Sequence, residues 1–338
     1  MLKAFVTGVA GLALTGDEIA FLRQERPAGL ILFDRNCGER AQLQALVAAF
    51  KDAVGCASTL VLIDQEGGRV QRLKPPFMPR LPPAAAYGLA YGRDRASALQ
   101  DAEIVSHWLA TELSALGVTV NCVPVLDLPV PGANAIIGDR AYGTEVADVV
   151  ALGRAVARGM LAGGVLPVMK HVPGHGRATK DSHLALPVVD TAADVLADSD
   201  FAPFRALRDL PMAMTAHVVY TALDATRPAS ISEAVVRTII RGRIGFDGLL
   251  ISDDLSMHAL TGPMQVRAAA VIASGSDLAL HCNGDLAEMA AVASAVPVLS
   301  GRALERYQAA LGLIALRRPA MCADDSVAAL GRIMSLLG

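Results

Sequence analysis

Short apolar segments alternate with longer helical patterns along almost the whole chain, and this alternation restricts the possible folds more than any other feature. Helix-like stretches such as Glu39–Val54 and Val146–Ala162 separate the apolar segments. Strands that alternate with helices predict a parallel sheet, which is either open and doubly wound or closed into a barrel. The eight strand-like segments are Ala4–Thr7, Gly29–Phe33, Thr59–Ile63, Val118–Val125, Val165–Met169, Met212–Thr215, Gly248–Ile251 and Asp277–Leu280.

The composition supports buried parallel strands. Hydrophobic residues make up 53% of the 338 residues but aromatic residues only 4%, so Ala, Val, Leu and Ile must form most of the core. Barrels of about 200 to 400 residues fold as one unit. We therefore expect an α/β fold, a single-domain (β/α)8 TIM-type barrel over residues 1–338, with its functional motifs within 30–285 and closing helices over about 300–338.

Charge and hydropathy argue against several kinds of partner. The net charge of −3 disfavours nucleic acid, because proteins that bind it usually carry a basic face. No polybasic run suggests a membrane surface, and no apolar stretch reaches the roughly 20 residues of a membrane span. The segment Lys3–Leu14 contains two glycines and runs into Asp17 and Glu18, so we interpret it as the first strand rather than a signal peptide. We expect a cytoplasmic monomer.

The cysteines form no recognisable metal or disulfide pattern. They are odd in number and dispersed, with no C-x-x-C pair, so reduced and buried thiols are expected. We accordingly expect no metal site and no cofactor. The five are Cys37, Cys56, Cys122, Cys282 and Cys322.

Charged or polar residues follow most of the predicted strands within a few positions of the strand end. Ordinary strand ends favour turn residues such as Gly, Ser and Asn, whereas here a Lys-His pair and several carboxylates occupy these positions. In a barrel the carboxyl ends of all strands meet on one face, where catalytic residues lie. The sequence therefore predicts a catalytic face formed by Asn36, Asp64, Asp127, Lys170, His171, His217, Asp253 and Asn283.

Four sequence blocks are specific when they are taken together. The most distinctive covers residues 170–183 and reads KHVPGHGRATKDSH. The others are residues 31–36 (ILFDRN), 64–72 (DQEGGRVQR) and 252–257 (SDDLSM), with a weaker fifth block at 138–143 (GDRAYG). In this order the blocks resemble glycoside hydrolase family 3, and within it the cytoplasmic β-N-acetylglucosaminidases of peptidoglycan recycling.

Asp253 is the predicted nucleophile. A retaining glycosidase needs one carboxylate to attack the anomeric carbon and one acid to protonate the departing oxygen. Asp253 ends the seventh predicted strand, which is a rigid mount, and the resemblance implies that the residue after the Ser of this block is the nucleophile. Asp254 should point elsewhere, because successive side chains of a strand alternate in direction. We expect it to provide hydrogen bonds behind the site or to cap a helix.

His183 is the predicted acid/base and Asp181 its partner. In an extended loop rich in Gly and Pro, a spacing of two residues lets both side chains face one way. Asp181 can then hold one imidazole nitrogen, which fixes the tautomer and leaves the other nitrogen to donate a proton. The resemblance also implies this role for His183. Family members with a second domain often take their acid from that domain, which we do not expect here.

Five further residues are expected to bind the sugar. Asp64 can accept two hydroxyl hydrogen bonds, whereas Arg72 and Lys170 can donate to sugar oxygens. His171 can do either, depending on its tautomer. The planar guanidinium of Arg140 suits the carbonyl of an N-acetyl group. The resemblance implies substrate contacts for all five.

Other residues of the same face have structural interpretations. Glu66 lies in a turn next to glycines. The sequence is equally consistent with a structural role for Glu66 and with a role as a second carboxylate of the site. His175 is interpreted as a structural loop residue. Asp127, His217 and Asn36 are expected to support the site.

The resemblance implies a retaining, exo-acting β-N-acetylglucosaminidase. Its natural substrates would be N-acetylglucosaminyl-1,6-anhydro-N-acetylmuramic acid and its peptide forms. Phosphorolysis at the same site is the nearest alternative, because a His acid leaves less negative charge than a carboxylate and phosphate could then approach the intermediate.

Two other classes of enzyme fit the sequence less well. A metal-dependent hydrolase would use His171, His175 and His183, but their spacing matches neither H-E-x-x-H nor the usual zinc patterns. A nucleotide-binding enzyme would need G-x-G-x-x-G or G-x-x-x-x-G-K-[ST], and neither occurs in the sequence.

Overall fold

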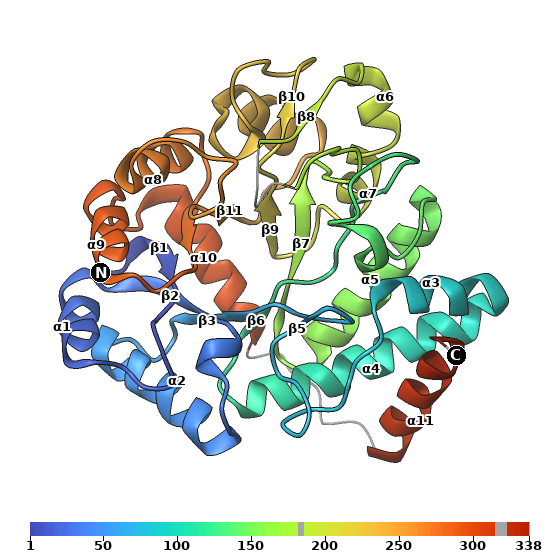
Figure 1. Ribbon diagram of the computed structural model, residues 1–338, viewed down its shortest axis with the longest axis horizontal. Coiled ribbons are helices and arrows are strands. Elements are labelled where there is room, and N and C mark those ends of the chain that lie inside the picture. The colour runs from blue at the N-terminus through green and yellow to red at the C-terminus, as the bar shows by residue number, and fades with distance from the viewer. Residues whose placement is uncertain (182–185, 315–322, 338) are drawn as a thin grey trace.

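Eight parallel strands close into a barrel (Figure 1). The computed structural model describes residues 1–181, 186–314 and 323–337. The strands follow one another in the order β1-β12-β11-β9-β7-β6-β3-β2, so the first and last strands of the barrel pair with each other. The predicted (β/α)8 barrel is confirmed. Its strands are β1 (Lys3–Thr7), β2 (Pro27–Leu32), β3 (Leu60–Ile63), β6 (Val120–Asn121), β7 (Leu166–Val172), β9 (Met212–Thr215), β11 (Leu249–Asp254) and β12 (Leu278–His281).

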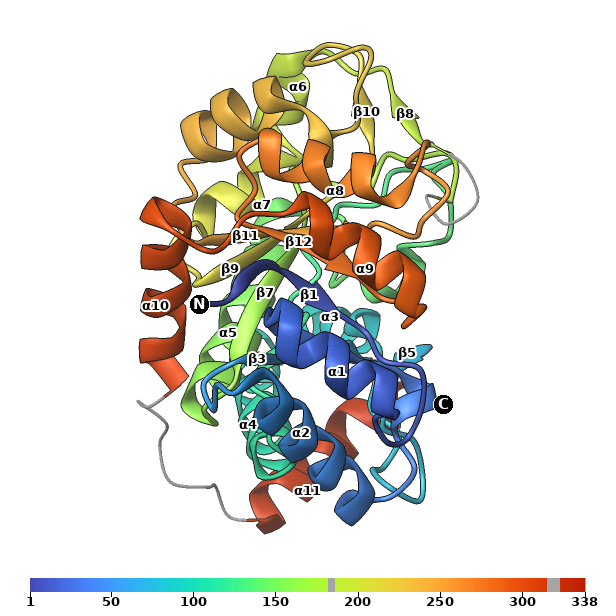
Figure 2. The same ribbon diagram turned by 90° about the vertical axis from the view of Figure 1, so that its left-hand side faces the viewer.

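Helices cover the outside of the barrel (Figures 1 and 2). One helical segment, Val235–Arg243, is a π-helix. Two small sheets lie apart from the barrel, an antiparallel pair of β4 (Gln65–Gly67) and β5 (Val70–Gln71) and a parallel pair of β8 (Val188–Val189) and β10 (Val219–Tyr220). The α-helices of the described chain are α1 (Gly16–Glu25), α2 (Arg40–Val54), α3 (Ala84–Arg93), α4 (Arg95–Ala115), α5 (Val146–Ala162), α6 (Ala193–Asp198), α7 (Phe201–Ala206), α8 (Met264–Ala273), α9 (Leu286–Ala295), α10 (Gly301–Ile314) and α11 (Ala323–Met334).

Some strand boundaries differ from those expected from the sequence. The strand predicted over Val118–Val125 is reduced to β6, and Pro124, which has no N–H to donate to the ladder, follows it closely. Beyond their predicted ends, β7 extends to Val172 and β11 to Asp254. Polar residues predicted to follow these two strands therefore lie on the strands themselves.

Side chains of the strands alternate between the barrel interior and the surrounding helices. On β3, Leu60 and Leu62 belong to one buried cluster, whereas Val61 and Ile63 belong to another, which also contains the buried side chains of α2. Because both faces of the strand are covered, its sequence is continuously apolar. Such a barrel interior is a packed core, so a ligand site has to lie above it, at the carboxyl ends of the strands.

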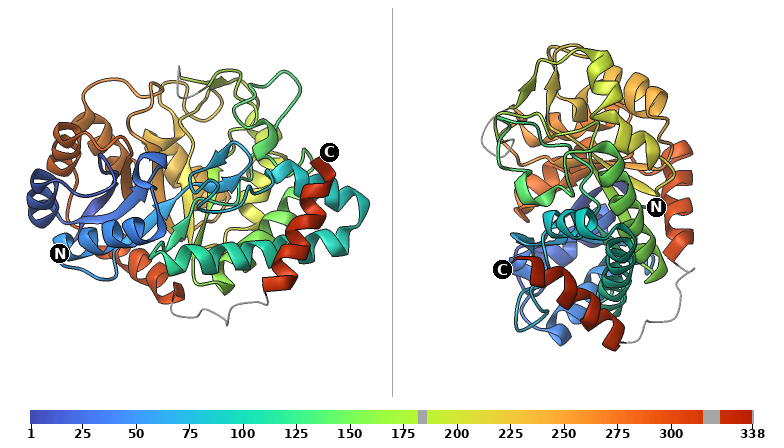
Figure 3. Two further views of the ribbon diagram at one scale, coloured as in Figure 1. Left: turned by 60° about the horizontal axis from the view of Figure 1, so that its bottom comes forward. Right: turned by 90° about the vertical axis from the view of Figure 1, so that its right-hand side faces the viewer.

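The C-terminal helix α11 packs on the helical layer that surrounds the barrel. Figure 3 shows α11 lying against α4, on the outside of the molecule. Arg332 of α11 pairs there with Asp101 of α4, whose side chain is buried. This ion pair joins the C-terminal helix to the helical layer.

A buried ion cluster ties the amino-terminal ends of β11 and β12 to α10. Asp277, directly before β12, accepts hydrogen bonds from Arg241 Nη2 (2.8 Å), from the backbone N–H of Leu250 (2.8 Å) and from Arg306 Nη1 (3.0 Å). Arg306 also pairs with Asp247, whose side chain is 59% exposed, whereas that of Asp277 is only 4% exposed. The cluster lies at the opposite end of the barrel from the carboxyl ends of the strands.

Replacement of Asp277 should cost more stability than replacement of Asp247, although both residues pair with Arg306. Asp277→Asn weakens three hydrogen bonds to a buried carboxylate, and we expect the free energy of unfolding to fall by about 2 kcal/mol. Asp247→Asn should cost less than about 1 kcal/mol, because exposed ion pairs contribute little. Urea denaturation followed by circular dichroism measures both, and equal losses would contradict this account.

Candidate active site

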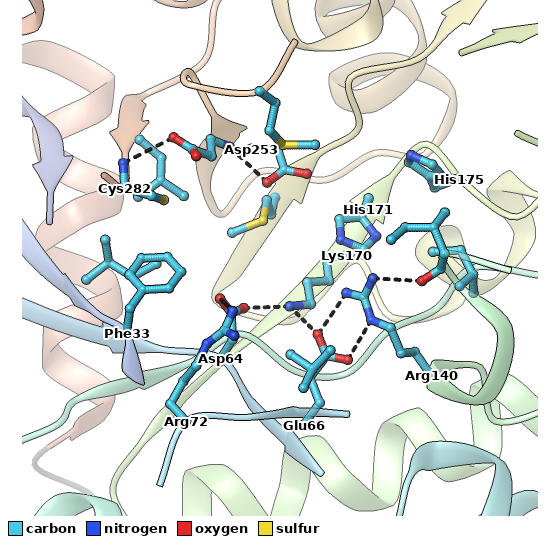
Figure 4. Close-up of a pocket in the computed structure, with 18 of the residues that line it drawn as sticks. Phe33, Asp64, Glu66, Arg72, Arg140, Lys170, His171, His175, Asp253 and Cys282 are labelled. Atoms are coloured by element: carbon cyan, nitrogen blue, oxygen red, sulfur yellow. Dashed lines mark hydrogen bonds and ion pairs between the residues drawn. The ribbon is translucent and has the colours of Figure 1, made fainter. Parts of the chain in front are cut away.

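The carboxyl ends of the strands surround a pocket of about 270 Å³ (Figure 4). Apolar side chains line part of its wall, among them Ile31, Met214 and Leu280 from β2, β9 and β12. The pocket brings together six of the predicted site residues, which come from segments far apart in the sequence: Asp64, Arg72, Arg140, Lys170, His171 and Asp253.

Lys170 lies at the centre of a buried ion-pair network (Figure 4). Its Nζ is 2.8 Å from Oδ1 of Asp64 and 2.7 Å from Oε1 of Glu66, and its side chain is 2% exposed. Glu66 also accepts hydrogen bonds from Nε and Nη2 of Arg140, both at 2.8 Å. Asp64 accepts one from Nη2 of Arg72 at 3.2 Å. Two carboxylates are thus shared among three cations.

The network keeps its members charged. Burial alone would raise the pKa of the Glu66 carboxyl, but the positive charges of Lys170 and Arg140 lower it to about 2. The same balance lowers the pKa of Asp64, and both carboxylates raise the pKa of Lys170 against the effect of burial. The site therefore presents fixed cationic donors and anionic acceptors, which suit the hydroxyl groups of a sugar.

Glu66 has both a structural and a pocket-lining position. It lies on β4, where the following Gly67 has a φ of 100° and a Cβ at Gly67 would meet the carbonyl oxygen of Pro82 at 2.2 Å. The turn therefore requires glycine, and it directs Glu66 toward Lys170 and Arg140 (Figure 4). A strand-end rule alone misses this residue, although a spacing of two after Asp64 is the spacing that places side chains on one side of extended backbone.

Asp253 and Asp254 have different environments at the end of β11. Oδ1 of Asp253 accepts the backbone N–H of Asp254 at 2.8 Å. Burial alone would raise the pKa of Asp253, but its neighbours, among them the backbone N–H of Asp254 and the charge of Lys170, lower it, so the carboxylate is ionised, as the predicted nucleophile has to be. Oδ1 of Asp254 accepts the backbone N–H groups of Ser256 (3.0 Å) and Cys282 (3.1 Å). Asp254 thus joins β11 to the segment after β12, and it also lines the pocket beside Asp253.

His217 and Asn36 hold the backbone around the pocket. Nε2 of His217 lies 2.9 Å from the carbonyl oxygen of Asp254, which can only accept, so Nε2 carries the proton. Burial lowers the pKa of His217, and its neutral ring then accepts from Ser230 Oγ at 2.6 Å. Nδ2 of Asn36 donates to two backbone carbonyls of the segment after β1, at 2.8 and 3.1 Å. Both residues act on backbone rather than on the pocket space.

The backbone after β7 packs closely on its neighbours. Oη of Tyr220 donates to the carbonyl oxygen of Gly174. A Cβ at Gly176 would lie 2.0 Å from the carbonyl oxygen of Leu128, so the two backbones are in direct contact. This packing fixes the start of the segment that leads to the predicted acid.

The predicted acid itself lies outside the described residues. The chain is described up to Asp181 and again from Leu186, so His183 is not included. The pairing of Asp181 with His183 therefore stays a prediction from the sequence, as does any closure of the Val172–Val189 loop on substrate.

The part of the chain that the structure describes contains neither a membrane-spanning helix nor a metal-binding cluster. In residues 1–181, 186–314 and 323–337, no helix combines the length and the apolar character that a membrane span requires. Within these ranges, no three His, Cys, Asp or Glu side chains are grouped in a way that could hold a metal ion.

A barrel with a pocket of paired charges at the carboxyl ends of its strands is an architecture that glycoside hydrolases use. The chain belongs to glycosyl hydrolase family 3, because the model of the N-terminal domain of this family matches residues 8–309. The family resemblance inferred from the four sequence blocks is confirmed.

Three relatives show how close the likeness is. A protein from Chromobacterium violaceum named beta-hexosaminidase is 40% identical over 308 residues, which cover 90% of this chain and 85% of that one. A family 3 beta-N-acetylglucosaminidase from Paenibacillus sp. str. FPU-7 gives a TM-score of 0.88 at 29% identity, covering 98% of this chain and 67% of that one. NagZ from Neisseria gonorrhoeae, in complex with N-trifluoroacetyl-D-glucosamine, gives 0.84 at 32% identity, with 99% and 98% covered.

Glu66→Gln should flatten the dependence of stability on pH in acid. Because the pKa of Glu66 is lowered from 4.5 to about 2 on folding, its contribution is complete above pH 4.5 and is lost as the pH falls toward 2. Over this range the free energy of unfolding should fall more steeply for the wild type than for the variant. Glu305→Gln, at a glutamate 63% exposed, is the control and should retain the wild-type slope. Parallel profiles for wild type and Glu66→Gln would contradict the buried ionised state.

Proposed function

We propose that this chain is a β-hexosaminidase that removes terminal β-linked N-acetylglucosamine with retention of configuration, with Asp253 as nucleophile and His183 as acid/base. One observation carries the proposal: the ionised carboxylate of Asp253 faces a pocket whose other wall is a fixed network of charged groups (Figure 4). The names of the relatives from Chromobacterium violaceum and Paenibacillus support the substrate class.

The size of the pocket supports action on a terminal sugar. Its volume of about 270 Å³ is slightly smaller than that of most ligand sites, which measure about 300–1,000 Å³, so the pocket suits one sugar ring better than several. Asp64 and Glu66 lie across the pocket from Asp253 (Figure 4). Hydroxyl groups of the ring would bond to the network while the anomeric carbon points at Asp253.

Arg140 is the proposed partner of the N-acetyl group. Glu66 holds its Nε and Nη2, and its Nη1 donates to the carbonyl oxygen of Ile136 at 3.2 Å, so the plane of the guanidinium is fixed. The gonococcal relative binds N-trifluoroacetyl-D-glucosamine, which is an N-acylated amino sugar, and this supports a role for an amide in recognition.

The proposed reaction consists of two displacements. In the first, a carboxylate oxygen of Asp253 bonds to the anomeric carbon as the bond to the glycosidic oxygen breaks, and the imidazolium of His183 gives its proton to that oxygen. In the second, the imidazole takes a proton from water, whose oxygen bonds to the anomeric carbon and releases Asp253. Asp181 orients the ring and stabilises its charged form.

The natural substrates that we propose are N-acetylglucosaminyl-1,6-anhydro-N-acetylmuramic acid and its peptide forms, cleaved in the cytoplasm. This part rests on the resemblance of residues 31–36, 64–72, 170–183 and 252–257 to the enzymes of peptidoglycan recycling. Product analysis with and without phosphate separates hydrolysis, which releases the free sugar, from phosphorolysis, which releases its 1-phosphate.

Asp253→Asn should lose activity by orders of magnitude while the protein stays folded, because the amide cannot form the glycosyl ester. A 5-fluoro glycosyl donor should label the wild type on one aspartate, which peptide mapping should locate at Asp253. Asp254→Asn is the matched control and should still be labelled at Asp253. Label on Asp254 or Glu66, or a product of inverted configuration, would contradict the assignment.

His183→Ala should slow substrates in proportion to their need for a proton. Glycosides with alkoxide-like leaving groups should be slowed severely, whereas those with acidic phenols should be slowed much less in the first step. Release of the sugar should then limit turnover, so burst kinetics should appear. Asp181→Asn should give a milder form of the same pattern. A uniform loss across all leaving groups, without a burst, would assign His183 to substrate binding instead.

A further inference from the structure

Asp127 is a fully buried carboxylate that the proposed reaction does not use. It lies in the segment after β6, and its side chain is 0% exposed. Its Oδ1 accepts the backbone N–H groups of His175 (2.7 Å) and His171 (3.2 Å), and its Oδ2 lies 2.7 Å from Nδ1 of His171. One carboxylate thus joins the end of β7, the imidazole that it carries and the loop that follows.

These contacts determine which nitrogen of His171 carries a proton. Burial alone would raise the pKa of Asp127, but its contacts with His171 and His175 lower it, so the carboxylate can only accept hydrogen bonds. Nδ1 of His171 must therefore be protonated. Nε2, on the other side of the ring, is the atom left for the pocket that His171 lines. The ring of His175 packs edge-to-face on that of His171, with 5.7 Å between centroids.

We propose that Asp127 is a positioning residue, which holds His171 with Nδ1 protonated so that Nε2 meets a hydroxyl group of the sugar. Lys170 can only donate a hydrogen bond, whereas Nε2 accepts one whenever Nδ1 carries the only proton of the ring, so the two neighbours can recognise different hydrogen-bonding groups. The inference rests on the proposed function for the nature of the ligand. The tautomer is a property of the resting protein.

Asp127→Asn is a decisive variant because the geometry dictates how its amide must turn. Two backbone N–H groups point at the position of Oδ1, so the amide oxygen has to remain there. The amide nitrogen then replaces Oδ2 and donates to Nδ1 of His171, which must become an acceptor. The proton moves to Nε2, and the ring presents a donor to the pocket where the wild type presents an acceptor.

Histidine-selective ¹⁵N labelling and long-range ¹H–¹⁵N correlation spectra report this tautomer without any substrate. The signals of His171 are those absent from His171→Gln. The wild type should show a protonated Nδ1, and Asp127→Asn should show the form protonated on Nε2. The kcat/KM for an aryl β-N-acetylglucosaminide should fall roughly 10- to 100-fold, by analogy with the loss seen when groups that orient metal-binding histidines are removed. In a His171→Gln background, Asp127→Asn should add little further loss.

Asp277→Asn is the matched control, since it also weakens three hydrogen bonds to a buried carboxylate, but at the far end of the barrel. It should keep the wild-type tautomer of His171 and the wild-type kcat/KM. If Asp127→Asn fails to fold, the spectrum of the wild type still decides, because a His171 protonated on Nε2 alone would overturn the inference. An unchanged tautomer and kcat/KM in a folded Asp127→Asn would overturn it as well. Inactivity of the wild type on hexosaminides would instead contradict the proposed function.

Discussion

A buried lysine determines how the site is built. Lys170 can keep its charge at 2% exposure only because two carboxylates contact it, and each of these needs an arginine of its own. The four charged groups around it come from the end of β3, from β4, from the residue directly after β5 and from the 3-10 helix Gly138–Arg140. A closed barrel brings the ends of such distant segments to one face. The side chains that stabilise the buried charge of Lys170 also line the pocket.

This arrangement also prepares the site for the proposed chemistry. Positive charge develops on the sugar ring during glycoside cleavage, and groups that are already oriented need not rearrange to meet it. Glu66 holds Arg140 by two hydrogen bonds, and the backbone N–H of Asp254 holds one oxygen of Asp253. Side chains that would be mobile on a surface are therefore fixed before any substrate arrives.

The predictable and unpredictable parts of the site differ in their physical origin. The positions of Asp64, Lys170 and Asp253 follow from a strand count, because carboxyl ends of parallel strands must converge. The position of Glu66 depends on the turn at Gly67, which packs against the backbone of Pro82. No pattern in the residues around Glu66 predicts that contact. The predicted strand lengths are less accurate than the predicted strand order. A proline closely follows the short β6, whereas β7 and β11 continue into polar residues, so the observed boundaries differ from the predicted ones by a few residues.

The sharing of charges within the pocket has a consequence for how such a protein can evolve. The members of the network around Lys170 satisfy one another, and loss of Glu66, for example, would leave the buried guanidinium of Arg140 without the carboxylate that it pairs with, which costs more than the contact it removes. New specificity on that wall requires concerted changes. The apolar wall formed by Met214, Met257 and Leu280 has no such coupling, and volume-conserving changes there are tolerated one at a time. Divergence among descendants of this sequence should accordingly begin on the apolar side and leave the ionic side intact.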